Sequence, residues 1–138
     1  MDSPLLMLDL MRAFYWFDEQ LRTRLAQRGW QGITRSQSLV LTNIANGVSR
    51  ASHIAANIGV SRQAMSQLIG EMIEAGLVEV APDPLDKRAQ LVRAAPAGAE
   101  IREAAQAILR DLEGELERNV GKRRLQSLRE ALGGVPVI

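Results

Sequence analysis

Apolar residues recur at intervals of three or four along most of the chain, which is the spacing of one face of an α-helix. In residues 5–28 a helix is expected, ending near Gly29, with a stripe of Leu10, Phe14, Phe17, Leu21 and Leu25. A second long helix is expected from Pro96 to about residue 119, with a stripe of Ile101, Ala105, Ile108, Leu112 and Leu116. A shorter helix over 122–132 carries Leu125, Leu128 and Leu132.

Shorter elements fill the middle of the chain. Residues 34–46 are expected to form a helix because Thr34 and Gln37 have the spacing of a capping box. A helix near 51–57 follows, then a turn at Gly59, and then a helix from 62 to about 75 that Ser61 would cap. Residues 77–81 and 89–93 are expected to be strands joined by turn formers over 82–88. The predicted fold is mainly α, with about six helices and one β-hairpin.

The helix over 62–75 divides into a polar arc and an apolar arc at about 100° per residue. The apolar arc, which we expect to pack on the domain, comprises Ala64, Met65, Leu68, Ile69 and Met72, whereas the polar arc comprises Arg62, Gln63, Ser66, Gln67 and Gly70. Arginine pairs with guanine and glutamine with adenine, while serine reaches bases or phosphates. The polar arc also lies at a helix N-terminus, where anions are favoured. It therefore fits either a surface that reads base edges or an ordinary solvated face.

The residues before this helix favour the first interpretation. Residues 53–68 read HIAANIGVSRQAMSQL, in which seven positions fit a helix-turn-helix. Ala55 is small where the two helices would cross, and Gly59 permits the left-handed backbone of a tight turn. The other five positions are apolar and would fill the angle between the helices: Ile54, Ile58, Val60, Met65 and Leu68.

The hairpin that follows has the features of a wing. Its expected tip, PDPLDKR, carries Asp83, Asp86, Lys87 and Arg88. Asp86 is two residues from Arg88, so we expect its carboxylate to orient the guanidinium. An arginine held at a ribbon tip suits the minor groove of DNA. The alternative is a solvated turn with a weak surface ion pair.

These segments resemble the MarR family of bacterial winged helix-turn-helix regulators. The resemblance is carried by IAANIGVSRQAMSQLIGEMIEAGLVEV and PDPLDKRAQLVRAAPAG, and it departs from the family pattern at Val80-Ala81, Ala94-Ala95 and His53. It implies a single domain over 1–138, with a winged helix-turn-helix lobe at 33–95 and dimerisation helices at 1–32 and 96–138. It also implies that Arg88 faces the minor groove, and that the major groove is faced by Ser61, Arg62, Gln63, Ser66 and Gln67.

Members of this family generally bind DNA as homodimers and often act as repressors that a small phenolic or lipophilic ligand releases. The resemblance therefore implies a sequence-specific, homodimeric repressor that binds a pseudo-palindromic double-stranded operator. The expected dimer seam comprises Leu5, Leu6, Leu8, Met11, Leu125 and Leu128. Tyr15, Trp16 and Trp30 are candidates, with Phe14 and Phe17 nearby, for a ligand pocket between the terminal helices and the winged lobe. Aromatic residues of a long helix also commonly belong to the core.

Composition narrows these expectations. The chain of 138 residues has 17 basic and 16 acidic side chains, and residues 49–93 hold five of each, so DNA-facing charge depends on placement. Arg50 and Lys87 are the further basic residues expected to contact DNA. The absence of cysteine excludes disulfides and suits the cytoplasm, and Asp2 stands where a signal peptide has positive charge.

The sequence favours a binding protein over an enzyme. It has no nucleophile elbow, no phosphate loop, no metal-ligand cluster and no apolar run that spans a membrane. Neither a cofactor nor a metal is therefore expected. The remaining rival is a winged-helix module that binds a protein and has no sequence-specific contact with DNA.

Overall fold

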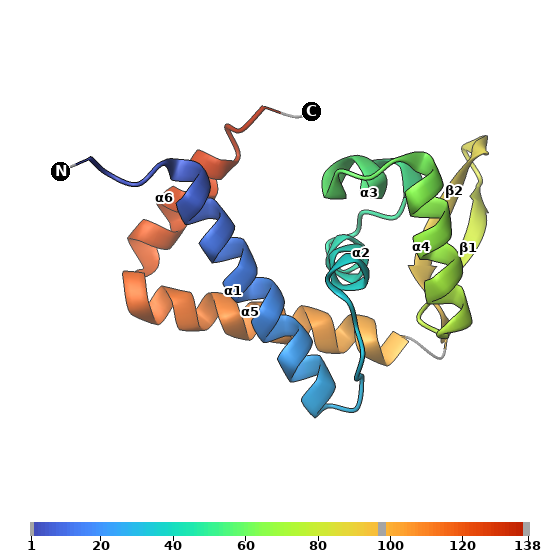
Figure 1. Ribbon diagram of the computed structural model, residues 1–138, viewed down its shortest axis with the longest axis horizontal. Helices are drawn as coiled ribbons and strands as arrows, with labels where there is room; N and C mark the ends of the chain where they lie inside the picture. The colour runs from blue at the N-terminus through green and yellow to red at the C-terminus, as the bar shows by residue number, and fades with distance from the viewer. Residues whose placement is uncertain (1, 97–98, 137–138) are drawn as a thin grey trace.

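The computed structural model describes residues 2–96 and 99–136, and Figure 1 shows two groups of elements. The first, called here the winged lobe, consists of α2 (Arg35–Ala45), α3 (Ala51–Ile58), α4 (Arg62–Glu74), β1 (Val78–Asp83) and β2 (Asp86–Ala94). The second, called here the long-helix layer, consists of α1 (Leu6–Gln27), α5 (Ala99–Val120) and α6 (Lys122–Leu132). The expected mainly helical fold with a two-stranded wing is confirmed.

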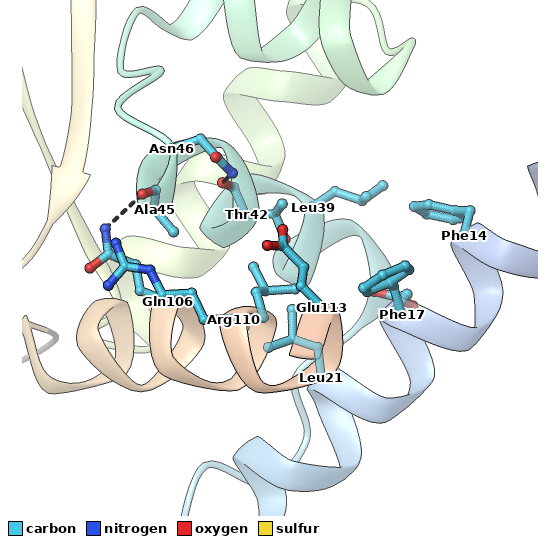
Figure 2. A pocket seen from close by; sticks show the side chains of 12 residues that line it. Phe14, Phe17, Leu21, Leu39, Thr42, Ala45, Asn46, Gln106, Arg110 and Glu113 are labelled. Carbon is cyan, nitrogen blue, oxygen red and sulfur yellow. Dashed lines mark hydrogen bonds between the residues drawn. The ribbon is translucent and has the colours of Figure 1, made fainter. Parts of the chain in front are cut away.

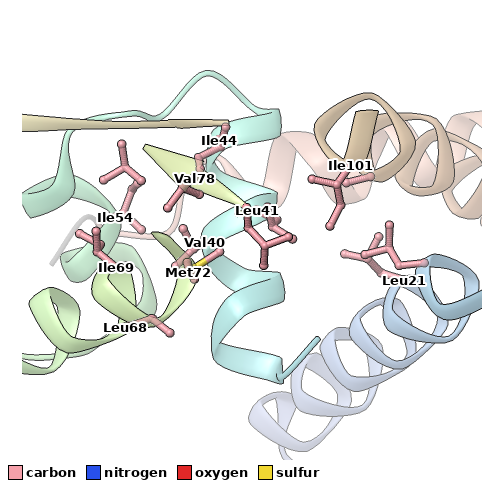
Figure 3. Close-up of a cluster of buried hydrophobic side chains, with 14 of the residues drawn as sticks. Leu21, Val40, Leu41, Ile44, Ile54, Leu68, Ile69, Met72, Val78 and Ile101 are labelled. Carbon is pink, nitrogen blue, oxygen red and sulfur yellow. The ribbon is translucent and has the colours of Figure 1, made fainter. Parts of the chain in front are cut away.

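One hydrophobic core joins the two groups through α2. Figure 3 shows Leu41 of α2 between the side chains of the winged lobe and those of Leu21 and Ile101 in the long-helix layer. Leu21, Leu41 and Ile101 are fully buried. Gln106 of α5 also donates a hydrogen bond to the Ala45 carbonyl at the end of α2, at 2.7 Å. These contacts fix the winged lobe against α1 and α5.

Local signals set the helix ends of the winged lobe. The Thr34 hydroxyl accepts from the Gln37 amide at 3.2 Å and the Gln37 side chain accepts from the Thr34 amide at 3.0 Å, which completes the predicted capping box. Ser61 caps α4 by accepting from the Ala64 amide at 3.1 Å. Gly59, between α3 and α4, has φ of 73°, the left-handed conformation that the tight turn requires.

The described part of α5 begins at Ala99, within the helix that the sequence predicts from Pro96. Residues 97–98, over which the predicted helix start extends, fall outside the described residues.

The strands of the hairpin reach closer to its tip than the sequence indicates. The antiparallel register runs from Val78 opposite Ala94 to Pro82 opposite Gln90, and then shifts so that Asp83 lies opposite Asp86. The predicted turn over 82–88 is therefore too long, because Pro82 and Asp83 belong to β1 and residues 86–88 to β2. An edge strand tolerates a proline that donates no ladder hydrogen bond, and β1 ends in such a position.

A buried carboxylate joins α1 to the beginning of α2. Asp18, which is 5% exposed, accepts hydrogen bonds from the Nε atoms of Arg22 at 3.0 Å and Arg35 at 2.9 Å. The Ser38 hydroxyl also donates to it. Burial of a carboxylate is tolerated when charged and polar donors surround it in this way.

The first half of α1 is not covered by its own chain. The predicted stripe is buried at Leu21 and Leu25, but Leu10 and Phe14 are 40% and 39% exposed. The stripe therefore marks an apolar face of which this chain covers only the C-terminal part. Of the helices described, none has the length and apolar character needed to cross a bilayer.

Candidate nucleic-acid interface and cavity

A groove of about 900 Å³ lies between α4 and the hairpin. Its walls come from α3, α4 and both strands, and they include four basic side chains: Arg50, Arg62, Lys87 and Arg88. Asp86 contributes a carboxylate and Ser66 a hydroxyl. The neutral charge of residues 49–93 thus conceals an asymmetric placement, with four of the five bases gathered along one groove.

The polar arc of α4 faces outward. Ser61, Arg62, Gln63, Ser66 and Gln67 are all exposed, and Arg62 and Ser66 also line the groove. The opposite arc is buried at Met65, Leu68, Ile69 and Met72, as expected. Ala64 is exposed, contrary to the expectation, because it lies about 90° from the centre of the buried arc at 100° per residue.

Asp86 does not orient the guanidinium of Arg88 as predicted. Its Oδ1 accepts instead from the backbone amide of Arg88 at 3.0 Å. A short side chain at this position reaches the amide two residues ahead, which is the geometry of an Asx-turn. Within residues 2–96 and 99–136, no carboxylate forms an ion pair with Arg62, Lys87 or Arg88.

Arg50 has a partner that the sequence does not reveal. Its guanidinium donates to Asp83 Oδ2 at 2.7 Å, and Asp83 Oδ1 accepts from the Leu85 amide at 2.9 Å. The Arg50 hydrogen bond, helped by the Leu85 amide, lowers the pKa of Asp83, and the same bond raises the pKa of Arg50. Asp83, which the sequence places in an exposed turn, is only 7% exposed. The two residues are 33 positions apart, so no local pattern could have paired them.

The tip of the hairpin also carries an exposed apolar side chain. Leu85 is 94% exposed and lies in the two-residue turn with Pro84. Leu85 is not among the residues that the sequence indicates for contact with DNA. Apolar side chains at such tips occur in proteins that press against the minor groove.

A separate cavity of about 400 Å³ lies between α1, α2 and α5, which is where a ligand pocket is expected (Figure 2). Its walls combine apolar side chains with a few polar and charged ones: Phe14, Phe17, Asp18, Leu21, Leu39, Thr42, Ala45, Asn46, Gln106, Leu109, Arg110 and Glu113.

The three aromatic residues predicted to line this pocket do not line it. Tyr15 lies under the Arg35 guanidinium, whose carbon is 4.3 Å from the ring centroid. Trp16 packs edge-on against Phe17, and Trp30 packs against the core. The helical repeat explains the correction for Tyr15 and Trp16, because Phe14, Phe17 and Leu21 share one face of α1 and the two residues between Phe14 and Phe17 point elsewhere. Trp30 lies beyond the end of α1. Among the described residues, no three His, Cys, Asp or Glu side chains are placed to hold a metal ion.

A helix-turn-helix followed by a two-stranded ribbon, with a basic groove between them, defines a winged-helix protein. Residues 31–89 match the model of the MarR family. Comparison with curated protein sequences gave no match. Wild-type MarR of E. coli in its apo form is 27% identical, with a TM-score of 0.64 over 96% of each chain. The chain is therefore similar to the MarR family of winged-helix transcriptional regulators, through the family model over residues 31–89 and through the solved MarR structures over 96% of its length.

Two further solved structures have the same fold. NadR in complex with 4-hydroxyphenylacetate is 18% identical, with a TM-score of 0.77 over 96% of this chain and 93% of its own. A cysteine-to-serine mutant of E. coli MarR, complexed with operator DNA, is 24% identical. It aligns with a TM-score of 0.63 over 95% of this chain and 97% of its own.

Proposed function

We propose that this protein is a homodimeric repressor that binds a pseudo-palindromic DNA operator and is released by a small aromatic ligand. The observation that carries the proposal is the groove between α4 and the hairpin. Four basic side chains line this groove beside an outward-facing arc of hydroxyl, amide and guanidinium groups. Arg62, Gln63, Ser66 and Gln67 would contact base edges in the major groove, and Ser61 a phosphate at the helix N-terminus. Lys87 and Arg88 would contact the backbone and the minor groove. A fold relative, the E. coli MarR mutant, is known in complex with operator DNA.

Dimer formation is supported by the uncovered apolar face at one end of the molecule. In Figure 1 the first turns of α1 and the helix α6 lie at the same end of the molecule. Large apolar side chains are exposed at the start of α1 and on α6: Leu5, Leu6, Met7, Leu8, Leu10, Met11, Leu128 and Leu132. A monomer rarely leaves so many large apolar side chains in water at one end of the molecule. In a two-fold dimer the two α4 helices would read half-sites roughly 34–36 Å apart, one turn of DNA.

Release by a ligand is supported by the cavity between α1, α2 and α5. Its volume of about 400 Å³ suits a single aromatic ring with a small substituent. Apolar walls at Phe14, Phe17 and Leu109 would hold the ring, while Arg110 offers a cation to an acidic substituent. NadR, which has the same fold, is known in complex with 4-hydroxyphenylacetate.

In-vitro selection of bound duplexes tests the DNA contact. Selected duplexes should show inverted half-sites about one helical turn apart, and affinity should fall as salt rises. Arg62→Ala should cost about 1–3 kcal/mol and relax the preference at one base pair. Arg123→Ala, which removes an exposed positive charge from α6 outside the groove, is the matched control and should leave the preference unchanged.

Failure to recover any preferred duplex at any salt concentration would reject sequence-specific binding and favour the protein-binding alternative. The ligand is tested separately by adding 4-hydroxyphenylacetate to the operator complex. Release should be weakened by Ala45→Leu, which narrows the cavity, while affinity for the operator in the absence of ligand should persist. If the ligand releases the wild type and Ala45→Leu equally from the operator, the cavity is not the ligand site.

A further inference from the structure

Arg50 stands at the junction of the helix-turn-helix and the hairpin. It is the N-cap residue of α3, yet its side chain makes no capping hydrogen bond. Its guanidinium instead reaches Asp83, the last residue of β1, at 2.7 Å. Its backbone forms an antiparallel bridge with Leu91 of β2, and the preceding Ser49 carbonyl accepts from the Val92 amide at 2.7 Å. One residue therefore links the start of α3 to both strands of the hairpin.

The ion pair lies where the pairing of the hairpin itself is interrupted. Up to Pro82 the two strands keep one register, but at Asp83 the register shifts and Lys87, Arg88 and Ala89 are left out of the regular ladder. Such irregularities bend a ribbon and weaken its ladder. The direction of the tip therefore depends on contacts outside the ladder.

Asp83 supplies those contacts with both of its carboxylate oxygens. Oδ2 accepts from Arg50, which fixes the end of β1 to the start of α3. Oδ1 accepts from the Leu85 amide, which closes the turn. The Asp83 side chain is 8% exposed and that of Arg50 is 33% exposed, so the pair is partly shielded from water and from salt. Arg50 also lines the groove with Arg62 and Arg88, so the pair sets the spacing of two walls.

We propose that the Arg50–Asp83 pair holds the wing tip at a fixed position relative to α4 and thereby increases the selectivity of the protein for its operator over other DNA. This inference rests on the proposed function and refines it, because Arg50 becomes a positioning residue instead of a direct DNA contact. Asp83 neutralises one of the four cations of the groove. That cation would otherwise attract any DNA regardless of sequence. The pair therefore increases selectivity in two ways. It fixes the position of the wing tip, and it removes one contact that would bind DNA of any sequence.

Two single variants and their double variant separate these effects. Asp83→Asn keeps an oxygen acceptor for the Leu85 amide but removes the ion pair and releases the Arg50 cation. Its operator affinity should fall by roughly tenfold, the low end of the change caused by one wrong base pair. Its non-specific affinity should rise, with a salt dependence steeper by about one unit per subunit. Arg50→Gln should lose operator affinity to the same extent without the steeper salt dependence. The double variant should lose no more operator affinity than either single variant.

Glu79→Gln is the matched control. Glu79 pairs with Arg93 at 2.6 Å on the same hairpin, at register partners near its base and away from the tip. This variant removes the same charge and releases a cation from the same ribbon. Its ratio of operator affinity to non-specific affinity should equal that of the wild type. Thermal unfolding of each variant checks that the domain remains folded.

The outcomes distinguish the inference from the function on which it rests. If the wild type selects an operator and both single variants keep its selectivity, the inference is wrong and the proposed function stands. If Arg50→Gln weakens operator and non-specific binding equally, with a shallower salt dependence, Arg50 is a phosphate contact and the inference is again wrong. If the wild type prefers no duplex, both fail. Hydrogen exchange of the Leu85 amide gives a readout without DNA, and it should be faster in Arg50→Gln than in the wild type.

Discussion

Replacement of Asp18 by asparagine tests whether the buried carboxylate holds α1 to α2. The variant is nearly isosteric, so it creates no cavity and changes only charge and hydrogen bonding. In the wild type the Asp18 carboxylate accepts hydrogen bonds from the guanidinium groups of Arg22 and Arg35, at 3.0 and 2.9 Å. The variant presents a neutral amide to the same two groups.

The cost follows from how each partner would respond. Breaking a fully buried ion pair typically costs about 3–5 kcal/mol. The Arg22 and Arg35 side chains are 30% and 44% exposed, so water can replace part of what they lose. The Ser38 hydroxyl has the Arg35 carbonyl 2.9 Å away as another acceptor. We therefore expect Asp18→Asn to lower the free energy of unfolding by about 2 kcal/mol, below the value for a fully buried pair.

Urea denaturation at constant protein concentration measures this loss, and the midpoint of thermal unfolding should fall by roughly 5–10 °C for a chain of this size. Glu115→Gln is the control, because Glu115 also joins two helices by an ion pair, with Arg24 at 2.9 Å, but is 37% exposed. That variant should cost less than about 1 kcal/mol. Equal losses for the two variants would refute the reasoning, since burial would then make no difference.

Three further predictions concern the turn, the tip and the apolar face. Gly59→Ala places a Cβ on a residue with φ of 73° and should lower the free energy of unfolding, measured in denaturant, by about 1–2 kcal/mol. Gly70→Ala, in the middle of α4 with open space around it, should raise the free energy of unfolding. The opposite order would contradict the conformational argument. The lowered pKa of Asp83 means that its pair with Arg50 is fully formed above the ordinary carboxyl pKa of about 3.9 and is lost as the pH falls through the lowered value. An NMR titration should therefore give Asp83 a midpoint below that value, which moves upward in Arg50→Gln; an unmoved midpoint would show that Arg50 is not the cause. Leu128→Glu should convert a dimer to monomers in sedimentation experiments. Leu85→Glu, at a leucine that is more exposed than Leu128 but lies on the wing, should not; dissociation by both variants would count against a seam at α6.

Features with a local signal were predictable from the sequence. Thr34 with Gln37 defined the start of α2, and Ser61 with Gly59 defined the turn between α3 and α4, because a cap or a tight turn depends on residues a few positions apart. The outward polar arc of α4 followed from the helical repeat, apart from Ala64 at its margin. The wing was recognised, but its strands were predicted too short because proline and aspartate usually mark turns.

Features that depend on distant partners were not predictable. Nothing local distinguishes the buried Asp18 from the exposed Asp9, because burial depends on Arg35 and Ser38, 17 and 20 positions later. The same holds for Asp83 and Arg50. The stripe on α1 identified an apolar face correctly, but a repeat does not say whether the covering surface comes from the same chain. The cavity-lining residues could be selected only once α1, α2 and α5 were placed around them.

The cavity has walls from both groups of elements, with α1 and α5 on one side and α2 on the other. A molecule inside it can influence operator affinity only by fitting two arrangements of these walls unequally. Thermodynamic reciprocity then applies. If a ligand in the cavity lowers the affinity of the protein for its operator by a given factor, binding to the operator lowers the affinity of the cavity for the ligand by the same factor. Protein engaged on DNA would consequently respond at higher ligand concentrations than free protein, so the abundance of operator sites would itself tune the dose at which repression ends.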